Sequence, residues 1–90
     1  MVKVILPSIL TKVTDGDHLS VDSGTVSDVL RKMVDIYGEP LREKLFDQKG
    51  EFIRFWQIFV NGLNIRFLDH LDTELHEDDE VALLPVVDGG

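Results

Sequence analysis

Residues 24–38, GTVSDVLRKMVDIYG, decide the fold, because they predict one long amphipathic helix. Counted from the first valine, apolar residues recur at offsets 0, 3, 4, 7, 8 and 11, which is the spacing of one helical face. Thr25 is the predicted N-cap, with Asp28 in the first turn, and Gly38 is the predicted stop. The helix is therefore expected over about residues 25–37, with its apolar face turned to a core.

Two strands are expected before this helix, over residues 2–7 and 17–22. Apolar and polar residues alternate in them with a period of two, as in a strand with one buried face. Asp15-Gly16 is a turn signal between them, so the two strands are expected to form an antiparallel hairpin with a long connection. Pro7 then lies at the end of the first strand, where its missing N–H does little harm.

The segment after the helix begins with Pro40, which can start a short helical piece. An exposed, polar loop is expected over residues 47–54. Residues 55–60 are aromatic and β-branched, which predicts a strand, and Asn61-Gly62 is the strongest signal in the chain for a tight turn.

Three further segments complete the predicted elements. A short return strand is expected over residues 65–67, and an acidic loop with at most a single helical turn over residues 71–80. The last strand is expected over residues 81–86, and Pro85 stops it near its end.

The predicted order is strand, strand, helix, strand, short strand, strand. A helix of this length between two hairpins is the kind of crossover that makes the outer strands parallel. One mixed sheet curled over one main helix then buries both layers around a single core. This α+β arrangement is the β-grasp.

Size and composition limit what the chain can do. Its 90 residues predict one β-grasp domain over residues 1–85, with residues 86–90 as a flexible tail. The net charge of −8 argues against a nucleic-acid partner, and it suits either a basic protein surface or solubility alone. The chain has no cysteine, so no thiol can act as a nucleophile or ligand. No apolar run is long enough for a membrane span or a signal peptide, so a cytoplasmic protein without a membrane partner is expected.

The sequence ends in Gly89-Gly90. Because glycine has no Cβ atom, a carboxylate on such a thread could enter a narrow enzyme tunnel that any side chain would block. The tail over residues 86–90 could reach on the order of 15 Å, enough to pass from a docking surface into a buried nucleotide site. The alternative is a frayed chain end that is glycine-rich without a function.

The chain resembles the ubiquitin-like sulfur carriers over nearly its whole length. The resemblance lies in the β-grasp order, in the helix opening Gly24-Thr25-Val26 and in residues 78–90, DDEVALLPVVDGG. Residues 3–38 are similar to the carriers of the molybdopterin type. Three other stretches are similar to carriers of the cysteine-pathway type: Arg54-Phe55, residues 58–61 and residues 65–67.

This resemblance implies that the reactive group is the carboxylate of Gly90, on an arm that includes Gly89. An adenylating enzyme would use ATP to join that carboxylate to AMP, and a sulfur donor protein would displace AMP to leave a thiocarboxylate. A sulfur-accepting biosynthetic enzyme of the cysteine, molybdopterin or thiamine pathway would then take the sulfur. The chain itself would bind no cofactor and would not be an enzyme, but a co-substrate or the small subunit of a sulfur-transferring complex.

Two other functions stay open at this point. The chain could be a ubiquitin-like modifier that forms isopeptide bonds through Gly90, which also begins with adenylation. It could instead be a plain β-grasp binding module with an accidental glycine ending. The terminal dipeptide alone does not separate these alternatives.

A docking surface is expected beside the root of the tail. Alternation in residues 55–60 places Trp56 on one face together with Ile58 and Val60, and Phe59 on the other. If the first face meets the helix, Phe59 points outward, and so does Leu84 in the last strand. Phe59 and Leu84 would then form an exposed apolar patch, which is typical of an interaction site. The opposite assignment stays open, because both faces are apolar.

Val86, Val87 and Asp88 complete the predicted partner-binding residues. Asp88 could pair with a basic residue at the mouth of a tunnel, or it could simply be solvated. No metal site is expected, because His70 and His76 flank acidic residues at a spacing that matches no standard metal motif.

Overall fold

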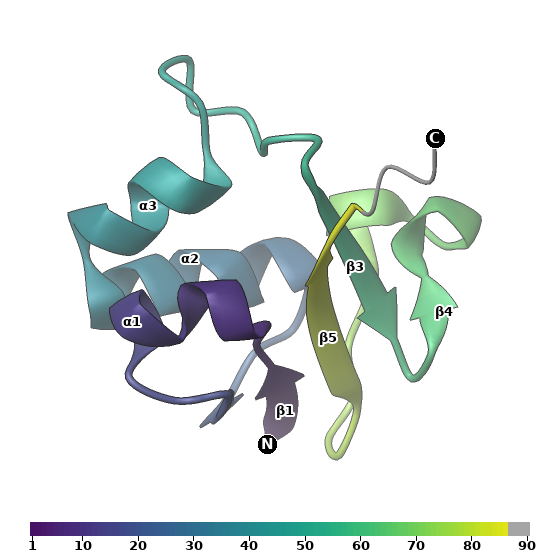
Figure 1. Cartoon of the computed structure of the whole chain (residues 1–90). Coiled ribbons are helices and arrows are strands. Elements are labelled where there is room, and N and C mark those ends of the chain that lie inside the picture. Colours follow the sequence, from purple (N-terminus) through teal and green to yellow (C-terminus); the bar gives the residue numbers. More distant parts are fainter. Residues whose placement is uncertain (87–90) are drawn as a thin grey trace.

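The computed structural model describes residues 1–86, which form one five-stranded sheet with helices packed on one side of it (Figure 1). The strand order is β2-β1-β5-β3-β4. Neighbouring strands are antiparallel except β1 and β5, which pair in parallel. The strands are β1 (Val2–Ile5), β2 (His18–Val21), β3 (Trp56–Val60), β4 (Leu63–Asn64) and β5 (Glu80–Pro85). This is the predicted β-grasp, with a mixed sheet and the two outer segments of the chain paired in its centre.

The helical segments cover one face of the sheet and fill its connections. The α-helices are α1 (Thr11–Thr14), α2 (Val26–Tyr37) and α3 (Glu39–Leu45), and three 3₁₀ turns are η1 (Ser8–Leu10), η2 (Ile65–Phe67) and η3 (His70–Asp72). Figure 1 shows α1, α2 and α3 together on one side, so the opposite face of the sheet carries no α-helix among the described residues.

The predicted main helix is confirmed as α2, with the predicted ends. The Thr25 hydroxyl accepts a hydrogen bond from the backbone N–H of Asp28 at 3.1 Å, which satisfies one of the free N–H groups of the first turn. At the other end Gly38 adopts a φ of 78°, a conformation that favours glycine, and its N–H donates to the carbonyl of Val34. The short helix predicted from Pro40 is also present, as α3.

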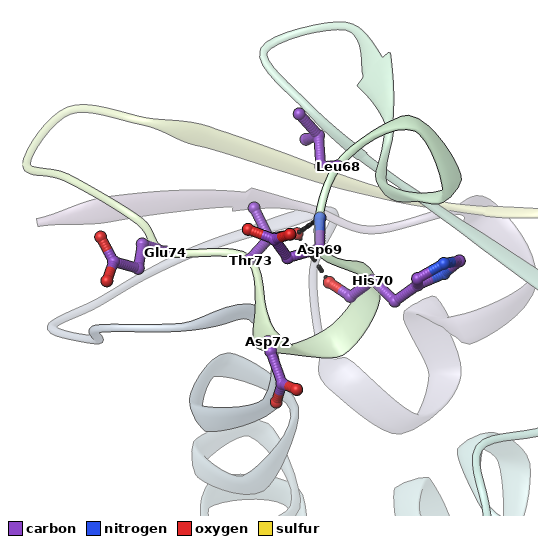
Figure 2. Close-up of a pocket in the computed structure, with 6 residues that line it drawn as sticks. All are labelled: Leu68, Asp69, His70, Asp72, Thr73 and Glu74. Carbon is purple, nitrogen blue, oxygen red and sulfur yellow. Dashed lines mark hydrogen bonds between the residues drawn. The ribbon is translucent and has the colours of Figure 1, made fainter.

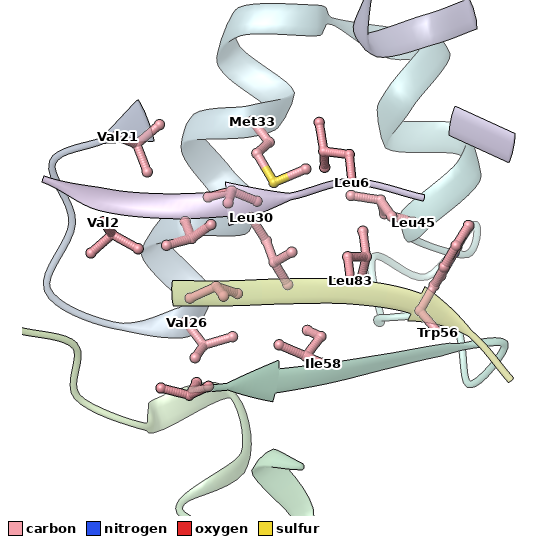
Figure 3. Close-up of a cluster of buried hydrophobic side chains, with 14 of the residues drawn as sticks. Val2, Leu6, Val21, Val26, Leu30, Met33, Leu45, Trp56, Ile58 and Leu83 are labelled. Carbon is pink, nitrogen blue, oxygen red and sulfur yellow. The ribbon is translucent and has the colours of Figure 1, made fainter. Parts of the chain in front are cut away.

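One hydrophobic core lies between α2 and the sheet (Figure 3). Leu30 and Met33 of α2 belong to the same cluster as Ile58 of β3 and Leu83 of β5. These side chains are almost completely buried. The sequence left open which face of β3 is buried. The structure shows that Trp56, Ile58 and Val60 point inward, as the predicted docking surface requires.

The turn between β3 and β4 has the geometry that its sequence predicts. Asn61 and Gly62 have φ values of 50° and 87°, and a type I′ hairpin needs a positive φ at both central residues. Asn61 also ties the turn to β5: its N–H donates to the carbonyl of Glu80, and its side-chain oxygen accepts from the N–H of Glu80.

The predicted return strand over residues 65–67 is wrong. Strand β4 is only Leu63–Asn64, and residues 65–67 form the 3₁₀ turn η2 instead. The reason is local, because the Asn64 side-chain oxygen accepts a hydrogen bond from the N–H of Arg66 at 2.9 Å and caps the turn. Ile65 is thereby buried in the core.

The connection between β1 and β2 is more ordered than a plain loop. It holds η1 and α1, and Leu10 between them is fully buried. The first strand ends at Ile5, two residues earlier than predicted, because Pro7 already caps η1. None of the helices within residues 1–86 has the length and apolar character needed to cross a membrane.

Candidate functional site

The root of the predicted tail lies at the end of β5. Val86 follows Pro85, and its N–H donates a hydrogen bond of 2.6 Å to the carbonyl of Phe55, just before β3. The side chain of Val86 is 37% exposed. The other predicted tail residues, Val87, Asp88, Gly89 and Gly90, lie outside the described residues.

The predicted apolar patch lies on the sheet face that carries no helix. Leu84 is 43% exposed, whereas Phe59 is half-buried, so Phe59 contributes less open surface than expected. The register pairs Phe59 with Ala82 and Ala82 with Ile5, and Leu84 follows two residues along β5 on the same face. We call Ile5, Phe59, Ala82 and Leu84 the outer strip. It forms a continuous apolar band that ends where the tail begins.

Phe55 is an exposed residue of this region that the sequence analysis did not select. It is 48% exposed, and its carbonyl holds Val86 at the tail root. Its ring packs edge to face against Trp56, with centroids 5.0 Å apart. The signal that could have found it was the same alternation that selected Phe59, continued four residues back along the chain.

The base of β5 is fixed by Asp79. Hydrogen bonds hold the pKa of its carboxyl below the usual range: the backbone N–H of His76 donates at 2.8 Å, and the Asn61 side-chain amide donates at 3.0 Å. This network joins the β3–β4 turn to the start of β5. It therefore fixes the register of the strand that carries Leu84 and leads to the tail.

A shallow hollow around η3 contains several acidic side chains (Figure 2). Leu68, Asp69, His70, Asp72, Thr73 and Glu74 line it. Its centre is occupied by structural hydrogen bonds, since the Thr73 hydroxyl donates to the His70 carbonyl at 2.7 Å and accepts from the Asp69 N–H at 3.0 Å. Within residues 1–86 no three metal-ligating side chains come together, at this hollow or elsewhere.

Comparison with known proteins gives close relatives over the full length of the chain. The ThiS family model matches residues 10–90. A protein of Archaeoglobus fulgidus that is provisionally named a sulfur carrier is 37% identical, over 99% of this chain and 98% of its own. The sulfur carrier protein CysO of Mycobacterium tuberculosis is 34% identical, over 99% and 98% of the two chains.

Solved structures of similar proteins share the fold. A chain in the crystal structure of the Amycolatopsis orientalis BexX/CysO complex superposes with a TM-score of 0.86 at 25% identity, over 100% of this chain and 100% of that one. The solution structure of the small archaeal modifier protein 1 from Methanosarcina acetivorans gives a TM-score of 0.85 at 36% identity, over 99% of this chain and 95% of that one. These neighbours are ubiquitin-like β-grasp proteins, and with the family match they establish that the chain belongs to the ThiS family of ubiquitin-like sulfur carriers.

Proposed function

We propose that the chain carries sulfur as a thiocarboxylate on Gly90. The observation that supports this most directly is the family match, because it runs through residue 90 and so includes Gly89-Gly90. In the first step the Gly90 carboxylate attacks the α-phosphorus of ATP on a partner enzyme, and pyrophosphate leaves. In the second step the sulfur of a hydrosulfide equivalent bonds to the acyl carbon, the bond to the AMP oxygen breaks, and AMP leaves with the electron pair.

The proposal assigns the catalytic groups to partner proteins. The chain supplies only a carboxylate on a slender arm and a surface by which enzymes recognise it. An adenylating enzyme, a sulfur donor protein and a sulfur-accepting enzyme are the required partners, and ATP is bound by the first of them. The BexX/CysO complex supports the idea of a protein partner, because a similar chain there is part of an assembly.

The outer strip is the proposed docking surface for the adenylating enzyme. It is apolar, it lies on the open face of the sheet, and it leads directly to the tail root at Val86. A tail of a few residues contributes little affinity by itself, so a docked apolar patch is needed to deliver Gly90 to the nucleotide. Among the three candidate pathways, the cysteine route is favoured by the resemblance around Arg54 to cysteine-pathway carriers and by the CysO relative.

The experiment that tests this function is an intact-mass measurement. The purified chain is incubated with the adenylating enzyme from the same genome, ATP and sulfide. We expect a gain of about sixteen daltons, as one oxygen is exchanged for sulfur at the acyl carbon. A variant lacking Gly89 and Gly90 is the matched control and should show no gain. An unchanged mass for the intact chain, under conditions where the enzyme modifies another carrier of the family, contradicts the proposal.

A second candidate function is protein modification, because the small archaeal modifier protein 1 is 36% identical to this chain. If the chain is a modifier, Gly90 forms isopeptide bonds with lysine side chains of other proteins. Cell extracts would then contain conjugates of high mass, and digestion with a protease that cleaves after Asp88 would leave a Gly-Gly remnant on the modified lysine. Such conjugates in the absence of any thiocarboxylate would favour the modifier over the sulfur carrier.

A further inference from the structure

A second surface feature near the tail root lies on the other side of β3 from β5. It is a groove between the free edge of β3 and the turns η2 and η3, and we call it the edge groove. Its lining includes Arg54, Trp56, Ile58, Arg66, His70 and Val86. The outer strip lies on the open face of the sheet, whereas this groove follows an edge of it, so the two surfaces are distinct.

The edge of β3 is open because β4 is too short to cover it. The β3–β4 ladder pairs Phe59 with Asn64 and Val60 with Leu63, and it stops there when the chain turns into η2. Residues 56–58 therefore have no neighbouring strand on this side among the described residues. The carbonyl of Phe55 and the N–H of Asn61 form hydrogen bonds with the β5 side. Because successive residues of a strand direct their N–H and carbonyl groups to opposite edges, those two groups of Ile58 face the groove.

The charge of the edge groove is opposite to that of the whole molecule. The chain has 17 acidic residues and only 9 lysines and arginines, yet the lining of this groove contains Arg54, Arg66 and His70 and no carboxylate. Within residues 1–86 neither arginine has an ion-pair partner, whereas Arg31 and Arg42 do. The guanidinium carbon of Arg66 lies over the ring of Phe67, 5.7 Å from its centroid.

The floor of the edge groove is apolar. Trp56, Ile58 and Ile65 contribute to it and are nearly buried, and Leu71 of η3 is half-buried beside them. The N–H of Trp56 donates to the carbonyl of Ile53, so the open part of the edge lies at Ile58. An apolar floor, this open edge and a cationic rim together match the chemistry of an extended peptide that alternates apolar and acidic residues. The backbone of such a peptide can pair with the edge, its apolar side chains can contact the floor, and its carboxylates can bind the two guanidinium groups.

We propose that the edge groove binds an extended acidic segment of a partner protein, which adds to the sheet as a strand beside β3. This site is additional to the outer strip and is independent of the chemistry at Gly90. It would allow an acidic partner to hold the carrier at the edge of its sheet while the open face is occupied by another protein.

The test uses the whole chain without ATP or an adenylating enzyme, so its result does not depend on the sulfur-carrier function. The probe is a short, acetylated and amidated peptide of alternating glutamate and valine. Binding is followed by the fluorescence of Trp56, the single tryptophan, and by the amide NMR signal of Ile58. We expect saturable changes in both, weakened by salt, because the contacts include ion pairs.

Variants and peptide controls make the test specific. Arg54→Gln and Arg66→Gln should each weaken peptide binding about threefold to tenfold, as expected for charge-assisted hydrogen bonds at an exposed rim. Lys32→Gln removes one charge from the exposed side of α2 and should leave the affinity unchanged. A peptide with alternate backbone amides methylated should bind much more weakly, because it cannot pair with the strand edge.

Four outcomes would overturn the proposal. The first is that a peptide with lysine in place of glutamate binds equally well. The second is that the methylated peptide binds like the unmodified one. The third is that the shifted amides are those of the outer strip instead of Ile58. The fourth is that binding requires removal of residues 87–90, because the occupant is then the chain's own C-terminal segment.

Discussion

Substitution of Leu84 is the best way to weaken docking to the adenylating enzyme without destabilising the fold. Its side chain points away from the core and is 43% exposed, so a charge there stays in water. We expect Leu84→Glu to leave the free energy of unfolding nearly unchanged and to weaken binding to the adenylating enzyme by about tenfold, a typical effect in the centre of an interface. Binding by calorimetry and unfolding by denaturant titration measure the two effects.

The matched control for this substitution is Ile36→Glu. Ile36 is an equally apolar residue, 55% exposed, but it lies on α2 on the opposite side of the sheet. It should affect neither binding nor folding. Equal losses of binding for the two variants, or unfolding of Leu84→Glu, would contradict the assignment of the outer strip. Phe59→Glu is a less clean test, because the half-buried ring makes a stability cost certain.

Trp56 illustrates how far single residues could be predicted. Alternation groups Trp56 with Ile58 and Val60 on one face of β3, and the structure decides that this face is the buried one. Its indole N–H donates to the carbonyl of Lys44 at 2.7 Å, which ties the end of α3 to the start of β3. No local pattern predicts that bond, because its partners lie twelve residues apart along the chain and meet only after the loop between them has folded.

The helix α2 depends on its first turn, where Thr25 caps the chain. Removal of the hydroxyl leaves the N–H of Asp28 without its acceptor, so we expect Thr25→Ala to lower the free energy of unfolding by about 1 kcal/mol. Thr25→Ser keeps the oxygen and should recover most of the loss. The midpoint of a denaturant titration measures both. If serine is as destabilising as alanine, the methyl group of Thr25 matters and the cap does not.

The elements that the sequence predicted well are those with a repeated signal. α2 repeats its apolar spacing over three turns, and residues 55–60 are aromatic or β-branched with the one exception of Gln57, so the pattern outweighs any single residue. The return strand was predicted wrongly because three residues carry too little pattern. In that segment one side-chain bond from Asn64 to the N–H of Arg66 decides between a strand and a 3₁₀ turn.

The whole fold should lose stability in acid. Hydrogen bonds and charge hold three carboxyl pKa values below their ordinary values in the folded state: Asp17 beside His18, Glu39 beside Arg42, and Asp79 with the His76 N–H and Asn61. A carboxyl with a lowered folded pKa stabilises the fold above its unfolded pKa, and that contribution disappears as pH falls through the folded value. We therefore expect the melting temperature to be steady near neutral pH and to fall below about pH 4.

Asp79→Asn tests the part of this acid effect that belongs to the turn between β3 and β4. The variant cannot lose a proton at position 79, so its melting temperature at neutral pH should be lower and should change less between pH 5 and 3. The control is Asp35→Asn, which removes an exposed carboxylate of α2 and should follow the unmodified chain. Circular dichroism across this pH range measures the difference. Parallel pH curves for Asp79→Asn and the unmodified chain would contradict the role of this carboxylate.

The sequence by itself determined the helices α2 and α3, the strands β1, β2, β3 and β5, their order and most of their inward faces. The physical reason is that helical and strand periods are properties of neighbouring residues, so burial follows from the pattern once a helix and a sheet must share one core. The same alternation predicted that Phe59 and Leu84 of the outer strip share one face of the sheet, but it left open which apolar face of β3 would be inside.

Only the tertiary structure decided which residues meet across the sheet and at its edge. The early stop of β4 opens the side of β3, and the turns η2 and η3 then bring Arg66 and His70 to the same groove as Arg54. Phe55 likewise reaches the tail root only because β3 and β5 are paired. Contacts of this kind depend on how distant segments pack and on where strand pairing ends, so no repeating pattern along the chain predicts them.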